Sequence, residues 1–377
     1  METSGTSPRV AQDASAVPQL AGVFDASGPF VTLYLDASAD VANAGPQVEL
    51  RWKNARRSLS EAGAPESLLA EIDAQVEDAH TRGATLAVIG SAEAGVLYVG
   101  HEQTPPASEL AQVGALPSIL PVLGLRQQSP PFVVVLIDRT GAEIHAVRHD
   151  LPDIKRELKE ATPDEVQKAA PGGWSQRRYH ERAENAWEST AGEVAAAVNK
   201  VAERVDARVV IVSGDVRAVT LLQDELAPSV ASKVVVVEGA RAGDGGFDAI
   251  EDEVRRLINT AVAEDTVAAL DKFREECGQH DRAADGVAAT IEALQMARVD
   301  MLLVSDDPAD DRTAFFGPDA ALVAADAATL KGLGVDDPSE GRLVDVCVRA
   351  ALGTGAGIRI VPAHGGPTDG IGAILRY

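Results

Sequence analysis

One short segment near the middle of the chain combines the residue types that contact RNA. It reads Gly172-Gly173-Trp174-Ser175-Gln176-Arg177-Arg178-Tyr179. Two glycines let a backbone enter crowded space, arginines supply positive charge, and the two aromatic side chains offer faces on which bases can stack. The segment therefore predicts a protruding, RNA-contacting loop. The alternative is a glycine-rich turn before a helix whose tryptophan packs in the core, and the residue types alone leave both open.

The second candidate site is a run of four cations without an intervening anion. Its members are Arg51, Lys53, Arg56 and Arg57. Apolar residues between Val48 and Leu59 recur at a helical period, which predicts a helix. Three of the cations lie roughly opposite the apolar stripe of this helix, so they form a compact cationic surface. Such a surface can neutralise phosphates, although an ordinary solvated helix face would have the same composition.

Composition limits the classes of function. The net charge of -24 argues against general attraction to DNA or to an anionic membrane surface. The two cysteines, Cys277 and Cys347, form neither a disulfide framework nor a metal or redox pattern, which fits a reducing cytoplasm. Met1 to Leu20 has neither the basic start nor the apolar core of a signal peptide, and no apolar run approaches the roughly 20 residues that span a membrane. We expect a soluble, cytoplasmic protein.

Generic enzyme signals are weak. The glycines from Gly353 to Gly357 follow a predicted helix and precede a strand, the reverse of a dinucleotide-binding loop, and no phosphate-binding loop with Lys occurs. Ser213 lacks the glycine two places earlier that a nucleophile elbow requires, so we expect a turn at a strand end. The acidic stretch from Asp306 to Asp311 lacks the ligand spacing of a calcium loop. We therefore expect no metal, no cofactor and no catalytic residue.

The elements that must position these groups follow from hydrophobic periodicity. An alternating pattern predicts a strand over Val31 to Leu35, and Phe132 to Ile137 with Ala142 to Val147 predict a β-hairpin. A short helix is expected near Asp153 to Glu160. Strands over Arg208 to Ser213 and Lys233 to Val237 alternate with helices, which predicts parallel strands with right-handed crossovers.

The fold class is therefore mixed α/β, and the length of 377 residues favours more than one core. Prolines cluster between Pro105 and Pro131, which suits a linker or a domain edge. We expect three small α/β domains, over residues 1–125, 126–277 and 278–377.

Residues 130–377 carry a resemblance to a known family. A long loop after a hairpin, a Gly-Gly pair, a serine and then Arg178-Tyr179 opening a helix resemble the middle domain of the archaeo-eukaryotic class-1 release factors, whose loop carries Gly-Gly-Gln. The end of the chain, Gly370 to Tyr377, is similar to the C-terminal end of Pelota and these factors. Trp174 stands where the family has its glutamine, and an indole cannot accept a hydrogen bond. The stop-codon-reading Asn-Ile-Lys-Ser pattern is absent.

The chain looks like the bacterial branch of this superfamily, including the Balon-type ribosome hibernation factors. The resemblance implies a stress factor that occupies the ribosomal A site, contacts rRNA without releasing peptide, and associates with elongation factor Tu. A second possibility is an enzyme of the peptidyl-tRNA hydrolase type that rescues stalled ribosomes through Gln176. A third is a soluble scaffold without ribosome contact, which the net charge of -24 favours.

Overall fold

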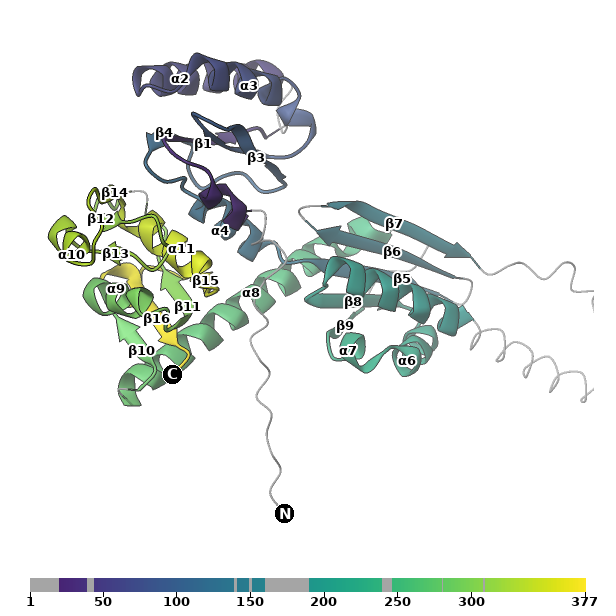
Figure 1. Ribbon diagram of the computed structural model, residues 1–377. Helices are drawn as coiled ribbons and strands as arrows, with labels where there is room; N and C mark the ends of the chain where they lie inside the picture. The colour runs from purple at the N-terminus through teal and green to yellow at the C-terminus, as the bar shows by residue number, and fades with distance from the viewer. Residues whose placement is uncertain are drawn as a thin grey trace, which may run out of the picture. The chain divides into compact units, whose positions relative to one another are not determined.

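The computed structural model describes residues 20–38, 44–138, 141–148, 151–159, 190–238, 246–279, 281–307 and 309–377. The chain divides into two compact units, one comprising Met1–Gln128 with Ala263–Tyr377 and the other comprising Ser129–Val262. Each unit combines sheets and helices, so the predicted mixed α/β class is confirmed (Figure 1). We call residues 20–128 the N-terminal lobe and residues 263–377 the C-terminal lobe of the first unit. The division into three domains stays a prediction, although each predicted segment contains a sheet.

The N-terminal lobe is a four-stranded antiparallel sheet in the order β3-β2-β1-β4. Its elements are η1 (Gly22–Asp25), β1 (Phe30–Asp36), α2 (Ala44–Glu61), α3 (Glu66–Val76), η2 (Ala79–Thr81), β2 (Thr85–Ser91), β3 (Gly95–Glu102), β4 (Leu110–Gly114) and α4 (Leu120–Gln128). Val48, Trp52 and Leu59 of α2 are buried against one face of the sheet, as their helical spacing predicts. Strand β1 and helix α2 confirm the two elements predicted first.

The proline-rich stretch is more ordered than predicted. It contains β4, which pairs with β1, and α4, so it is not a linker; the boundary between the two units falls within it, at Gln128–Ser129, which agrees with the alternative of a domain edge. Pro121 stands at the second position of α4, where an intrahelical N–H donor is not needed. Proline clustering therefore marks the start of a helix here.

The C-terminal lobe has a larger sheet in the order β10-β16-β11-β15 and a smaller one in the order β13-β12-β14. Its elements are β10 (Ala283–Asp285), α9 (Val287–Gln295), β11 (Val299–Val304), β12 (Thr313–Phe316), β13 (Val323–Ala324), α10 (Ala327–Gly332), β14 (Ser339–Arg342), α11 (Leu343–Gly353), β15 (Gly357–Ile360), η3 (Thr368–Gly370) and β16 (Ile371–Leu375). Residues of the second half of α8 (Gly246–Gln279), including Leu270 and Phe273, pack with β11 and β16. Helices α9 and α11 share another core with the same sheet.

The two lobes of the first unit share one hydrophobic core. Tyr34 and Ile119 of the N-terminal lobe belong to the same buried cluster as Leu302 and Val346 of the C-terminal lobe. The side chain of Gln127 in α4 also bonds β15, since its Nε2 donates to Ile358 O at 2.8 Å and its Oε1 accepts from Ile360 N at 3.0 Å. The lobes therefore form a continuous unit even though they are far apart in the sequence.

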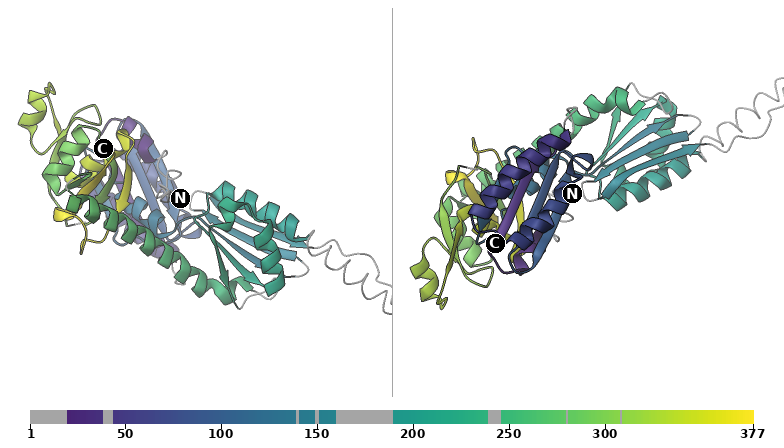
Figure 2. Two further views of the ribbon diagram at one scale, coloured as in Figure 1. Left: turned by 90° about the horizontal axis from the view of Figure 1, so that it is seen from below. Right: turned by 90° about the horizontal axis from the view of Figure 1, so that it is seen from above.

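The second unit is a five-stranded sheet in the order β7-β6-β5-β8-β9 with helices on both faces (Figure 2). Its elements are β5 (Phe132–Ile137), β6 (Gly141–Arg148), β7 (Leu151–Lys159), a helix over 190–205, β8 (Val209–Gly214), α6 (Val216–Glu225), α7 (Pro228–Ala231), β9 (Val234–Val237) and the first half of α8. Strands β5, β8 and β9 are parallel, which confirms the predicted pairing, while the right-handed crossovers stay a prediction. Alternate residues of β5 pack on opposite faces: Val133 and Val135 face the helix over 190–205, and Val134 and Leu136 face α8.

The segment after the β5–β6 hairpin differs from expectation. The sequence favoured a short helix near Asp153 to Glu160, but residues Leu151–Lys159 form β7, antiparallel to β6. The apolar residues Ile154 and Leu158 lie four apart, a spacing that fits a helix turn and also one face of a strand. Pairing with β6 satisfies the backbone of this segment, and tertiary context of this kind overrides local pattern.

Candidate functional site

Helix α2 carries the four predicted cations, and the fold pairs two of them with carboxylates. Arg51 forms ion pairs with Asp36 at 3.2 Å and Glu109 at 3.5 Å, and its Nη1 donates to Asp36 O at 2.9 Å. Burial tends to raise the pKa of Asp36, but hydrogen bonds from Ser38 and the charge of Arg51 hold that pKa below its usual value. Arg51 therefore joins α2 to β1 and to the start of β4.

Arg56 is held in a similar way. Its Nε donates to Asp73 Oδ1 at 3.1 Å, and its Nη2 donates to Glu66. Hydrogen bonds to Glu66 and then Asp73 raise the pKa of Arg56. Trp52 Nε1 donates to the same Asp73 oxygen at 2.7 Å, so one carboxylate of α3 binds two residues of α2. This arrangement ties the two helices together.

The other two cations face solvent. Lys53 and Arg57 are exposed, and within the described residues neither forms an ion pair; Arg57 Nη2 lies 3.5 Å from Asn54 Oδ1. Leu50 is 60% exposed one turn before Lys53. Positions 50, 53, 54 and 57 follow one face of a helix, and we call Leu50, Lys53, Asn54 and Arg57 the α2 stripe. The stripe combines two charges suited to phosphate contacts with an apolar and an amide side chain.

The other predicted site lies outside the described residues. This holds for all eight of its members, Gly172, Gly173, Trp174, Ser175, Gln176, Arg177, Arg178 and Tyr179. The structure describes the strand before this segment, β7, and the helix over 190–205 that follows it. Both belong to the second unit, which therefore carries the segment.

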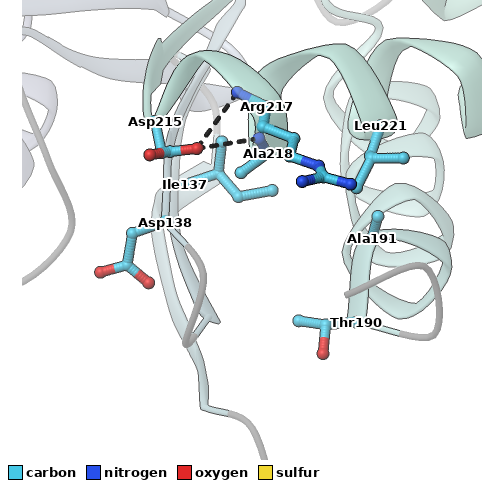
Figure 3. A pocket seen from close by; sticks show the side chains of 8 residues that line it. All are labelled: Ile137, Asp138, Thr190, Ala191, Asp215, Arg217, Ala218 and Leu221. Atoms are coloured by element: carbon cyan, nitrogen blue, oxygen red, sulfur yellow. Dashed lines mark hydrogen bonds between the residues drawn. The ribbon is translucent and has the colours of Figure 1, made fainter. Parts of the chain in front are cut away.

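A pocket in the second unit lies at the carboxyl ends of the parallel strands β5 and β8 (Figure 3). Its lining consists of Ile137, Asp138, Thr190, Ala191, Asp215, Arg217, Ala218 and Leu221. Asp215 caps α6, because its Oδ1 accepts from Arg217 N at 3.1 Å and Ala218 N at 3.4 Å. Carboxyl ends of parallel strands are common binding positions in α/β folds.

Glycine is required beside this pocket. Gly214 has φ +148°, and a Cβ there would lie 1.7 Å from Ile137 O. Ser213 lies near the end of β8, as predicted, but a single residue, Asp215, connects the strand directly to α6 in place of the expected turn. The pocket itself was missed, although one signal was available: Asp138 and Asp215 each follow a run of β-branched residues. The polar lining residues Asp138, Thr190, Asp215 and Arg217 have further interactions, so we assign the pocket no ligand.

The described residues contain neither a membrane-spanning helix nor a metal-binding cluster. None of their helices has the length and apolar character to cross a membrane. No group of three or more His, Cys, Asp or Glu among them is arranged to hold a metal ion. Asp310 of the acidic stretch instead pairs with Arg312 at 2.6 Å.

The second unit, with the first half of α8, is the part of the chain for which a family model matches. Residues 131–279 match the Bacterial archaeo-eukaryotic release factor family 2. The match includes the Gly-Gly-Trp-Ser-Gln segment and α8. It confirms the resemblance for this region, while membership of the Balon-type branch stays a prediction.

Two relatives and three solved structures extend the comparison. The uncharacterized proteins Rv2629 and MT2704 of Mycobacterium tuberculosis strains H37Rv and CDC 1551 are each 28% identical over 362 residues, covering 93% of this chain and 94% of the relative. Dom34 of S. cerevisiae is 11% identical, with a TM-score of 0.39, over 65% of this chain and 63% of Dom34.

Archaeoglobus fulgidus Pelota is 20% identical, with a TM-score of 0.33, over 78% of this chain and 79% of Pelota. The archaeal termination factor aRF1 is 14% identical, with a TM-score of 0.26, over 97% and 99% of the two chains. All three TM-scores are below 0.5, so no property of those structures is transferred to this chain.

Proposed function

We propose that this protein is a ribosome-associated translation factor that occupies the vacant A site during stress without releasing peptide. The observation that carries the proposal is the match of residues 131–279 to a release factor family, in a segment where Trp174 replaces the glutamine of the Gly-Gly-Gln loop. Such a factor acts in the cytoplasm and contacts rRNA.

The chemical argument rests on the side chain at position 174. Release requires a group that positions water and stabilises developing charge beside the peptidyl ester. The indole of Trp174 has one N–H donor and no acceptor, so it cannot perform both tasks. Its large face can instead stack on a base, which contributes about 1 to 3 kcal/mol to binding in single-stranded nucleic acid complexes. Occupancy is therefore the role that this residue supports.

A second candidate function is supported by Gln176. It is the only side-chain amide in the segment from Gly172 to Tyr179, and it stands two positions after the expected place. A rebuilt loop of the peptidyl-tRNA hydrolase type would bring this amide to the ester.

Peptide release on ribosomes separates the two functions. Ribosomes that carry peptidyl-tRNA are mixed with the protein, binding is confirmed by co-sedimentation, and released peptide is measured. We expect release at the rate of buffer alone, and Trp174→Gln should not restore it, since catalytic positioning to about half an ångström depends on the surrounding shell. Release that disappears in Gln176→Ala would establish the hydrolase instead.

Binding without release still has to be distinguished from no function at the ribosome. Trp174→Ala should weaken co-sedimentation, because it removes the stacking face and keeps both glycines. If the wild-type chain fails to co-sediment, the scaffold without ribosome contact is the correct class. That class agrees with the net charge of -24.

A further inference from the structure

A buried carboxyl lies where the two lobes of the first unit meet. Asp345, in the first turn of α11, is 3% exposed, and its Oδ1 has no hydrogen-bond partner among the described residues. The nearby Arg342 directs its guanidinium to backbone oxygens, with Nε 3.1 Å from Asp310 O and Nη2 2.5 Å from Asp307 O. Asp345 therefore lacks the ion pair that usually accompanies a buried carboxylate.

The N-terminal lobe presents uncharged groups to this carboxyl. Ser118 is fully buried; its backbone O accepts from Tyr34 Oη at 2.8 Å, and its backbone N donates to Thr32 Oγ1 at 3.2 Å. The Ser118 hydroxyl lies close enough to lower the pKa of Asp345, yet no hydrogen bond of normal geometry joins the two side chains. The contact between the lobes thus contains two incompletely bonded polar groups.

The remaining charges around Asp345 partly cancel. Burial raises its pKa to about 7, the charge of Arg342 and the hydroxyl of Ser118 oppose this rise, and Asp306 adds to it. Burial also raises the pKa of Asp306, which Arg342 lowers and Asp307 raises.

Two neutral neighbours complete this environment. Burial raises the pKa of Cys347 to about 12 and the pKa of Tyr34 well above its usual value. Arg312 lowers the pKa of Cys347, while the charge of Asp345 raises both. The thiol and the phenol therefore stay uncharged near neutral pH, and Asp345 is the buried group of this contact that titrates there.

We propose that Asp345 is a proton-operated latch between the N-terminal and C-terminal lobes. When it is protonated, the contact contains no buried charge at this point, and the carboxyl gains a donor that it can share with a neighbouring oxygen. When it is ionised, the contact encloses a charge without an ion pair, which favours loosening.

The direction of the pH dependence follows from linkage. The pKa of Asp345 is about 7 in the closed contact and 3.8 in water, so the closed form binds the proton more tightly. The stabilising contribution is complete below about pH 3.8 and is lost as pH rises through about 7. Acidification of the cytoplasm below neutrality would therefore tighten the contact.

Thermal unfolding of the full chain between pH 5 and 8.5 tests the latch. Asp345→Asn imitates the protonated carboxyl, so its Tm should exceed wild type by a small margin at pH 5, by an increasing margin up to about pH 7, and by a nearly constant margin above that. The matched control is Asp336→Asn, on an exposed residue of the same lobe, and its Tm should follow wild type at every pH. A constant Tm difference between Asp345→Asn and wild type would overturn the proposal.

Hydrogen exchange on the wild-type chain gives a test that does not depend on how the asparagine variant folds. After correction for intrinsic exchange rates, protection of residues 114–119 and of α11 should fall together as pH rises through about 7. In Ser118→Ala the midpoint should move to higher pH, because the hydroxyl that lowers the pKa of Asp345 is removed. Protection that does not change with pH would refute the latch.

Discussion

The four cations of α2 illustrate how neighbouring residues of one type can have different tasks. Arg51 and Arg56 join α2 to β1, β4 and α3 through carboxylates, whereas Lys53 and Arg57 are exposed in the α2 stripe. A cation that is already paired must lose its partner before it can bind phosphate. We therefore expect Lys53 and Arg57 to carry the ribosome binding that is proposed for this helix.

Replacing both exposed cations tests this assignment at the scale of single residues. Lys53→Gln with Arg57→Gln should weaken ribosome co-sedimentation and lower the salt dependence of log Kd by about one for each lost phosphate contact, with an unchanged Tm.

Arg51→Gln with Arg56→Gln is the matched control, since it removes the same charge from the same helix. It should retain binding and lose roughly 1 kcal/mol of stability, because these ion pairs are partly exposed. Equal loss of binding in the two double variants would show that only net charge matters.

At the scale of elements, α4 protects the edge of a sheet. One of its side chains forms hydrogen bonds that a neighbouring strand would otherwise form. β15 is an edge strand, and the amide of Gln127 bonds both Ile358 O and Ile360 N on it. An edge protected in this way is closed to pairing with another chain.

Gln127→Ala should destabilise the first unit by about 1 to 2 kcal/mol in urea unfolding, because a backbone N–H and a C=O lose their partners. Gln128→Ala is the control, since Gln128 is exposed and next in sequence. Gln127→Glu should recover part of the loss only if the carboxylate still accepts from Ile360 N. Equal stability of the two alanine variants would contradict the role of Gln127.

The helices and strands show how much of the fold the sequence could predict. Runs such as Phe132–Ile137 and the stripe from Val48 to Leu59 predicted strands and a helix correctly, because local periodicity determines them. The pairing that makes β7 a strand depends on β6, and no local pattern reports it.

The candidate site residues divide in the same way: the sequence identifies the residues, but only the fold shows which groups they contact. The sequence identified four cations on α2, but Glu109 is 58 positions from Arg51, so only the fold could show that Arg51 is paired. The sequence also predicts the helix before Gly353, which is α11, but the burial of Asp345 depends on Ser118 and Tyr34 of the other lobe, which lie near it.

At the scale of the whole molecule, the two lobes of the first unit share a hydrophobic core, and this limits which experiments can test for a protein partner. The C-terminal lobe exposes acidic residues, including Asp337 and Glu340, and it also exposes Leu333, whose relative exposure is 57%. Such a surface repels RNA and suits a protein, and we propose elongation factor Tu as that partner. Deleting residues after about 280 would expose the core of the N-terminal lobe, so substitution is the better test.

Asp337→Lys with Glu340→Lys should abolish capture of elongation factor Tu by the full chain while Tm stays within a few degrees of wild type. Lys53→Gln with Arg57→Gln should leave this capture unchanged. Retained capture by the doubly reversed variant would place the partner elsewhere.

The discontinuous first unit also determines the order of events during synthesis. Residues 31–113 can close the face of their sheet beneath α2 and α3 as soon as they leave the ribosome, because that core is local. Residues of η1 and α4 cover part of the opposite face, and the rest of its core is completed by β11, α11 and β16. At about 5 to 20 residues per second, the interval between Gln128 and Tyr377 lasts on the order of 10 to 50 s. Throughout that time the apolar side chains that pack against the C-terminal lobe stay exposed on the nascent chain.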